Sequence, residues 1–175
     1  MVRDAKAGLV VGIAAALGLA GVALASRKKP EEGPSAKIQI VFYDSEGNVV
    51  EHHSPVDLLE GEAYTAVITV TNASTKGGVP CEATLHGTTD CWIMAEGWPE
   101  PVYLVHDTFA GGFGPGESMP FYFPFAIPSG SGAAGGVIDV SVTDPDGNVI
   151  ATASEPVKII SVAIIYGATI DIGIS

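Results

Sequence analysis

The sequence contains few basic side chains. Of its 175 residues, 8 are Lys or Arg and 20 are Asp or Glu, which gives a formal net charge of −12 at pH 7. Beyond residue 36 the only Lys or Arg side chains are Lys37, Lys76 and Lys158. An acidic surface repels the phosphate backbone of nucleic acids, so we expect no nucleic-acid partner.

Motifs of catalysis and metal binding are also missing. The four histidines form no HExxH metal motif, and the sequence has no G-x-S-x-G nucleophile motif. Asp107 follows His106, but adjacent residues of a strand point to opposite faces of a sheet. The sequence therefore predicts no catalytic residue, no metal ligand and no cofactor, and hence a protein that is not an enzyme.

Cysteine occurs only at positions 81 and 91. A hairpin that turns around His86 and Gly87 would place Cys81 and Cys91 opposite each other on two strands, close enough for a disulfide. The alternative is two buried free thiols. We favour the disulfide, which would indicate an oxidising compartment.

Residues 7–26 form a run of small and aliphatic residues without charge, and Arg27-Lys28-Lys29 follows it directly. Twenty residues at about 1.5 Å each form a helix of about 30 Å, the thickness of the hydrocarbon core of a bilayer. We predict a single hydrophobic helix here, spanning a membrane or lying in a filament core. A short charged N-terminus, residues 1–6, precedes it, and a polar linker, residues 27–36, follows it.

Three interpretations of this helix remain open. Ala23-Leu24-Ala25 fits the cleavage site of a secretory signal. Lys6-Ala7-Gly8 resembles the cleavage site of archaeal type IV pilin leaders, whose helix stays on the mature subunit. The third interpretation is an uncleaved anchor, which we favour because three basic residues directly after the site disfavour cleavage by signal peptidase.

Small residues form one face of this predicted helix, and such faces let helix backbones approach closely in lipid. They are Gly8, Gly12, Ala14 and Gly18. We expect this face to pack against other copies of the helix. The positive charges on the two flanks nearly balance, so the charge rule does not fix the orientation.

Residues 37–175 consist of short β-branched segments separated by Gly, Pro and Asp. Residues 63–71 alternate, with Tyr64, Ala66, Ile68 and Val70 on one face and threonines on the other, where Val67 is the exception. Many short strands of this kind predict one antiparallel β-sandwich. The predicted strands are 37–43, 49–52, 63–71, 81–86, 89–94, 102–109, 120–127, 137–143, 149–153, 157–166 and 169–174.

Two similar segments lie 100 residues apart, Asp44-Ser-Glu-Gly-Asn48 and Asp144-Pro-Asp-Gly-Asn148. Each predicts a tight turn in which Gly and Asn adopt the required backbone angles. A calcium loop is the alternative interpretation of the second segment. It is disfavoured because Gly147 occupies a ligand position and the downstream Glu is missing.

Residues 67–72, within EGE-AYTA-VITVTN, and residues 116–128, GESMPFYFPFAIP, resemble the immunoglobulin-like or fibronectin-III-like sandwiches of prokaryotic surface proteins. With the N-terminal hydrophobic helix, the chain also resembles archaeal type IV pilin-like subunits. The resemblance covers residues 37–160 and implies an all-β fold class, an Ig-like antiparallel β-sandwich preceded by a single N-terminal α-helix. It implies no ligand, because such sandwiches host many functions.

Two loop aromatics are candidates for binding a sugar or a peptide: Trp98 in residues 94–101 and Phe113 in residues 109–116. The alternative is that both rings fold back and cover the ends of the sandwich. Asn72-Ala73-Ser74 matches the N-glycosylation motif at the end of a predicted strand, which makes Asn72 a candidate glycosylation site.

The C-terminal strands carry almost no charge; from residue 159 onward the only charged side chain is Asp171. Such strands pair with other chains if left on an open edge. They are either interior strands of the sandwich or strands that a neighbouring subunit covers by β-augmentation.

These observations predict a structural surface protein that assembles with itself through its helix and its sandwich. It would belong to a filament, a virion or an envelope, or be membrane-anchored with an extracellular β domain. Its partners would be further copies of itself and, through residues 7–26, a membrane or a filament core. The competing hypothesis is a monomeric membrane-tethered module that binds sugar or peptide through Trp98 or Phe113.

Overall fold

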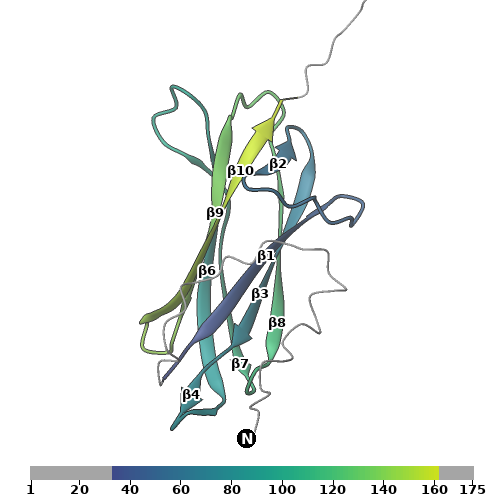
Figure 1. Cartoon of the computed structure of the whole chain (residues 1–175). Coiled ribbons are helices and arrows are strands. Elements are labelled where there is room, and N and C mark those ends of the chain that lie inside the picture. The colour runs from purple at the N-terminus through teal and green to yellow at the C-terminus, as the bar shows by residue number, and fades with distance from the viewer. Residues whose placement is uncertain (1–32, 162–175) are drawn as a thin grey trace, which may run out of the picture.

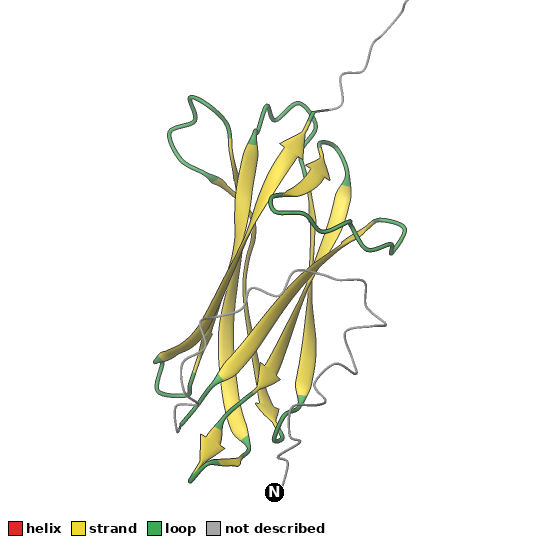
Figure 2. Cartoon of the chain, in the orientation of Figure 1, coloured by secondary structure: helices red, strands yellow, loops and turns green. Residues whose placement is uncertain are grey.

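The computed structural model describes residues 33–161 of the chain, which form strands and loops (Figure 2). The strands are β1 (Ala36–Asp44), β2 (Val56–Leu59), β3 (Ala63–Asn72), β4 (Thr75–Lys76), β5 (Val79–Pro80), β6 (Ala83–Met94), β7 (Val102–Phe113), β8 (Ser118–Ala126), β9 (Gly135–Thr143) and β10 (Val149–Ile160).

The predicted fold class, a sandwich preceded by a helix, is corrected to a sandwich alone, because residues 33–161 contain strands and no helix. Within this range no helix is therefore available that could cross a membrane. Residues 7–26, with the predicted packing positions Gly8, Gly12, Ala14 and Gly18, lie outside the described residues, as does the segment from residue 162 onward. The structure supports the β-sandwich alone.

Two sheets face each other in this sandwich (Figure 1). The three-stranded sheet has the order β1-β3-β8 and is antiparallel. The five-stranded sheet has the order β2-β10-β9-β6-β7, in which only β2 and β10 run parallel. The chain crosses between the sheets from β7 to β8 and again from β8 to β9, as in immunoglobulin-like sandwiches.

Alternation along the strands produces the core between the sheets. In β3 every second side chain is buried, namely Tyr64, Ala66, Ile68, Val70 and Asn72. The buried side chains of the five-stranded sheet that complete the same hydrophobic cluster include Leu85, Ile93, Ile138, Val140 and Val142. Removal of this apolar surface from water is the main force that holds the two sheets together.

The sequence predicts a turn near Gly87, but β6 runs through this position without a break. Gly87 pairs with Phe109 of β7, and a Cβ atom at Gly87 would overlap the ring of Phe109. The glycine therefore makes room for an aromatic ring inside the sheet. The two strands predicted at 81–86 and 89–94 are one strand.

The two similar turns are confirmed and have the same geometry. The Oδ1 atom of Asp44 accepts hydrogen bonds from the backbone N–H groups of Glu46 and Asn48, at 2.9 and 2.8 Å. Asp144 does the same with Asp146 and Asn148, at 3.0 and 2.9 Å. The carboxylates thus complete the turns, and Gly47 and Gly147 adopt positive φ angles of 85° and 84°.

Candidate functional site

The outer face of the three-stranded sheet carries no carboxylate among the described residues, and we call it the uncharged face. Register and alternation place fourteen side chains on it, and only Lys37, at one end, is charged. They are Lys37, Gln39, Val41 and Tyr43 of β1; Ala63, Thr65, Val67, Thr69 and Thr71 of β3; and Ser118, Pro120, Tyr122, Pro124 and Ala126 of β8.

The centre of the uncharged face is apolar. Val41, Val67 and Tyr122 lie side by side across the three strands. Tyr122 is 65% exposed, more than any other large hydrophobic side chain of the described residues. Val41 and Val67 are partly buried beside it, so the apolar centre of the face is small and consists mainly of the exposed ring of Tyr122.

A hollow of about 520 Å³ opens on this face. It lies between the turn that contains Asp44 and Gly47 and the side chains of Thr65, Val67 and Tyr122. The turn projects beyond the strands because its backbone folds back on β1, where Val50 N–H donates to the carbonyl of Phe42 at 2.9 Å. The uncharged face is therefore bounded by a rigid acidic turn at the end opposite Lys37.

The edges of this sheet are protected against strand pairing. The backbone carbonyl of Glu117 accepts a hydrogen bond from Asn72 N–H, and Ile127 N–H donates to the backbone carbonyl of Glu62. The backbone hydrogen bonds between β8 and β3 are therefore made by the odd-numbered residues of β8. The even-numbered residues of β8 direct their backbone N–H groups to the open edge of the sheet. Two of these residues are Pro120 and Pro124, which have no N–H to offer to another strand. On the other side, the segment after Asp44 covers part of β1. An associating molecule would meet the face of this sheet more readily than its edges.

The predicted disulfide between Cys81 and Cys91 is wrong, because both thiols are free. Cys81 precedes β6 and Cys91 lies near its far end. Ten residues of strand separate them by about 33 Å, whereas a disulfide needs Cα atoms within about 7 Å. Burial raises the pKa of the Cys91 thiol to about 12, so this thiol stays protonated at neutral pH.

The structure also contradicts the prediction of a glycosylation site at Asn72, because this residue is buried and only 1% exposed. Its Nδ2 group donates to the carbonyls of Cys81 and Gly114, at 2.8 and 3.0 Å, and its Oδ1 atom accepts from the N–H of Ser74 at 2.9 Å. The amide ties three chain segments together. A glycan could not be attached to it without unfolding this end of the sandwich.

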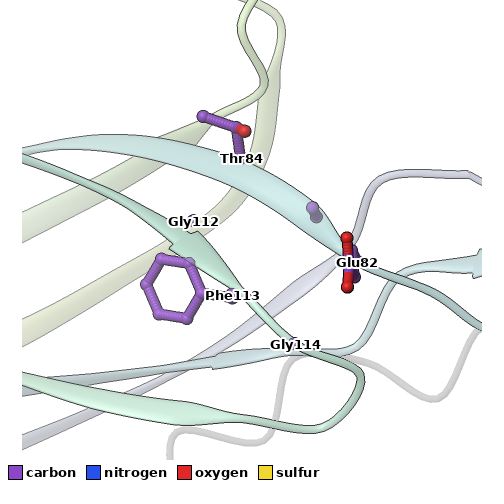
Figure 3. A pocket seen from close by; sticks show the side chains of 6 residues that line it. Glu82, Thr84, Gly112, Phe113 and Gly114 are labelled. Carbon is purple, nitrogen blue, oxygen red and sulfur yellow. The ribbon is translucent and has the colours of Figure 1, made fainter.

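Neither predicted loop aromatic is a free binding residue. Phe113 ends β7 and is 2% exposed, so its assignment as an exposed loop side chain is wrong. Figure 3 shows its ring on the side of the sheet away from Thr84. Trp98 is half-buried and packs against the core cluster. Both rings close the sandwich, which is the alternative that the sequence left open.

The histidines make isolated contacts. His106 Nδ1 lies 2.5 Å from Asp90 Oδ1 on the exposed outer face of the five-stranded sheet. His52 Nε2 lies 3.4 Å from the buried carboxylate of Glu155. Between residues 33 and 161 no three His, Cys, Asp or Glu side chains are placed to hold a metal ion.

Sequence reasoning missed the uncharged face. The alternation of residues 63–71 already shows Val67 as an apolar exception among threonines, but residue type alone does not show that Val41 and Tyr122 lie beside it. The pairing of β1 and β8 with the two sides of β3 brings them together.

No protein-family model matches the sequence, and no curated protein matches it. Among solved structures, the chain is similar to the CARDB domain of a Pyrococcus furiosus protein in complex with di-metal ions. The identity is 12% over 78% of this chain and 100% of that one, with a TM-score of 0.47.

Two further similar structures are the putative ApaA protein from Bordetella pertussis and the sporulation control protein Spo0M from Bacillus subtilis. The first is 12% identical over 72% of this chain and 96% of that chain, with a TM-score of 0.41. The second is 15% identical over 71% of this chain and 49% of that chain, with a TM-score of 0.37.

At these identities and TM-scores the similarities carry no functional argument. The resemblance to archaeal pilin-like subunits is corrected by the described residues themselves, because 33–161 form strands and loops and contain no helix. The described residues are a β-sandwich module of immunoglobulin-like topology.

Proposed function

We propose that this sandwich is a non-enzymatic structural module that associates with further copies of itself through the uncharged face. It would serve an extracellular or surface assembly such as an envelope, a virion or a filament. One observation carries the proposal: a chain of net charge −12 has a whole sheet face without a carboxylate among its described residues.

Charge favours a second copy as the occupant of this face. Two strongly acidic molecules repel each other in most orientations, and this repulsion is weakest where the uncharged faces meet. Lys37 lies at one end of the face and the turn with Asp44 and Glu46 lies at the other. A two-fold axis through the face would bring Lys37 of each copy to the acidic turn of the other.

The size of the face indicates weak association. Three strands at about 4.8 Å spacing and nine residues at about 3.4 Å give roughly 450 Å² per copy, or about 900 Å² in total. This is below the roughly 1,600 Å² of a standard stable interface. We expect pairing at high local concentration, which is the condition inside an assembly with many copies.

Sedimentation velocity of the full chain in mild detergent, from about 5 to 500 µM, tests the proposal. Tyr122→Glu adds a charge at the centre of the face without disturbing the core, because Tyr122 is 65% exposed. We expect wild type to associate as its concentration rises and Tyr122→Glu to associate at least tenfold more weakly. Thr152→Glu, which adds the same charge to an exposed position of β10, is the matched control.

Three results would overturn the proposal. The first is wild type that stays monomeric throughout this concentration range. The second is association that Thr152→Glu weakens as much as Tyr122→Glu does. Association unaffected by Tyr122→Glu would likewise show that another part of the chain holds the copies together.

A further inference from the structure

A shallow trough follows β6 and β7 on the outer face of the five-stranded sheet, on the side of the sandwich away from the uncharged face. One hollow of about 390 Å³ is lined by His86, Thr88, Thr108, Ala110 and Thr143, over the backbone of Gly87 and Phe109. The next hollow, of about 370 Å³, continues along the same two strands past Thr84 and Gly112 to Glu82 (Figure 3).

The trough exists because β7 carries very small residues opposite larger ones on β6. Thr84 pairs with Gly112, and His86 pairs with Ala110. A Cβ atom built on Gly112 would meet nothing within 4 Å, and Gly112 has no positive φ angle that would require glycine. Glycine weakens a strand and often marks a place where a ligand comes close to the backbone. The fold itself does not explain the glycine at this position.

The lining of the trough is hydroxyl-rich and carries no carboxylate between its two ends. Thr84, Thr88, Thr108 and Thr143 supply hydroxyl groups that donate and accept hydrogen bonds, and His86 supplies an imidazole. Glu82 stands at one end, and Asp90, bonded to His106, stands at the other. Carboxylates at both ends repel a polyanion and leave neutral ligands unaffected.

An exposed aromatic ring lies on the same outer face, beyond the pair of His106 and Asp90 at which the trough ends. Tyr103 is 57% exposed and stands edge to face with the imidazole of His106, with 6.2 Å between the ring centroids. Nine residues of strand separate it from Gly112, or about 30 Å. An aromatic face can stack against the C–H groups of a flat apolar ring surface.

From this combination we propose that the β6–β7 trough binds a linear neutral oligosaccharide. The hydroxyl groups and His86 would bond to sugar hydroxyls, Tyr103 would stack against one sugar ring, and the bare backbone at Gly112 would admit the chain closely. The trough is open along the sheet, so it would accept an internal segment of a polysaccharide as well as a chain end. The site does not depend on self-association, because it lies on the other sheet.

Isothermal titration calorimetry of the full chain tests this inference. The probes are neutral hexasaccharides of glucose, mannose and N-acetylglucosamine, and a hexagalacturonate serves as the anionic comparison. We expect at least one neutral probe to bind with a dissociation constant below about 1 mM and the anionic probe to bind at least tenfold more weakly.

Gly112→Leu fills the trough where the structure has open space, and Tyr103→Ala removes the stacking ring. Each should weaken binding at least tenfold while the circular dichroism spectrum stays that of wild type. Thr152→Leu, which places the same leucine side chain at an exposed position of β10, should bind as wild type does. The inference is overturned if no neutral probe binds at 5 mM, if the anionic probe binds best, or if Gly112→Leu binds as well as Thr152→Leu.

Discussion

At the scale of single residues, the side chain of Asn72 makes hydrogen bonds to several separate segments of the chain. It ends β3 inside the core, where its amide bonds to the segments around Cys81, Gly114 and Ser74. A buried amide stabilises the fold only when all of its polar groups are hydrogen-bonded, because each buried polar group without a partner lowers the stability by about 1–3 kcal/mol.

We predict that Asn72→Ala lowers the free energy of unfolding by about 2–4 kcal/mol, since it leaves several buried carbonyl and N–H groups without partners. Urea denaturation measures this change. Thr71→Ala, the neighbouring outward-facing residue, should cost less than about 1 kcal/mol. Protein secreted from a glycosylating host should carry no glycan at Asn72, and a glycan found there by mass spectrometry would contradict the buried amide.

The two turn aspartates make stability depend on pH. The side-chain and backbone hydrogen bonds from Asn148 lower the pKa of Asp144 below its ordinary value of 3.8, and the backbone N–H of Asn48 does the same for Asp44. Because the folded state holds the charged form, this contribution is present above the unfolded pKa and is lost as the pH falls through the lower, folded pKa.

Asp144→Ala should therefore melt at a lower temperature than wild type at pH 7. The difference should shrink as the pH falls below the ordinary pKa of Asp and then through the folded pKa. Thermal unfolding followed by circular dichroism at a series of pH values measures it. Asp146→Ala, in the same turn, is the control, because its backbone N–H and not its carboxylate bonds to Asp144. Equal, pH-independent losses in both variants would contradict this role for Asp144.

At the scale of elements, β7 is the longest strand with an open edge among the described strands. Thr108 N–H, at the middle of β7, donates to Oδ1 of Asp107 at 2.7 Å. This local bond occupies a donor that an incoming strand would need, and the carboxylate repels further acidic chains. Asp107 thus protects β7 as the prolines protect β8.

We predict that Asp107→Val, made in the Tyr122→Glu background, gives new concentration-dependent association or aggregation, because valine favours strand pairing and frees the N–H. Light scattering against time measures it. Thr88→Val, on the paired strand β6, is the matched control and should leave solubility unchanged. Equal solubility of Asp107→Val and the control would show that the β7 edge needs no protection.

Strand prediction failed where a residue had a tertiary role. Pro156 and Gly87 both appear in the sequence as breaks, yet β10 and β6 pass through them. Proline has no backbone N–H, but β2 pairs with β10 only from Val157 onward, so Pro156 removes no hydrogen bond between these two strands. Gly87 accommodates Phe109. Neither reason is visible in local sequence, because each depends on a strand far away in the chain.

At the scale of the whole molecule, net charge and the uncharged face act against each other. The charge of −12 opposes any close approach of two copies, while the face lowers that repulsion in one orientation. Salt screens long-range repulsion, with a Debye length of about 10 Å at 0.1 M ionic strength. Salt does not screen the contact between the apolar side chains of the two faces.

We therefore predict that raising NaCl from about 20 to 500 mM strengthens self-association several-fold. Sedimentation equilibrium at each salt concentration measures the change. Lys37→Gln should leave the direction of this salt dependence unchanged. Association that weakens with salt would instead mean that ion pairs, such as that between Lys37 and the acidic turn, dominate the interface.

The sequence by itself determined the all-β character of residues 33–161, the two Asp-Gly-Asn turns and the acidity, because alternation and turn chemistry are local and charge is additive. Only the tertiary structure decided which residues are exposed together. It buried Asn72 and Phe113, separated Cys81 from Cys91, and joined Val41, Val67 and Tyr122 on one face. The physical reason is that strand register brings together residues far apart in the chain, and no local pattern encodes it.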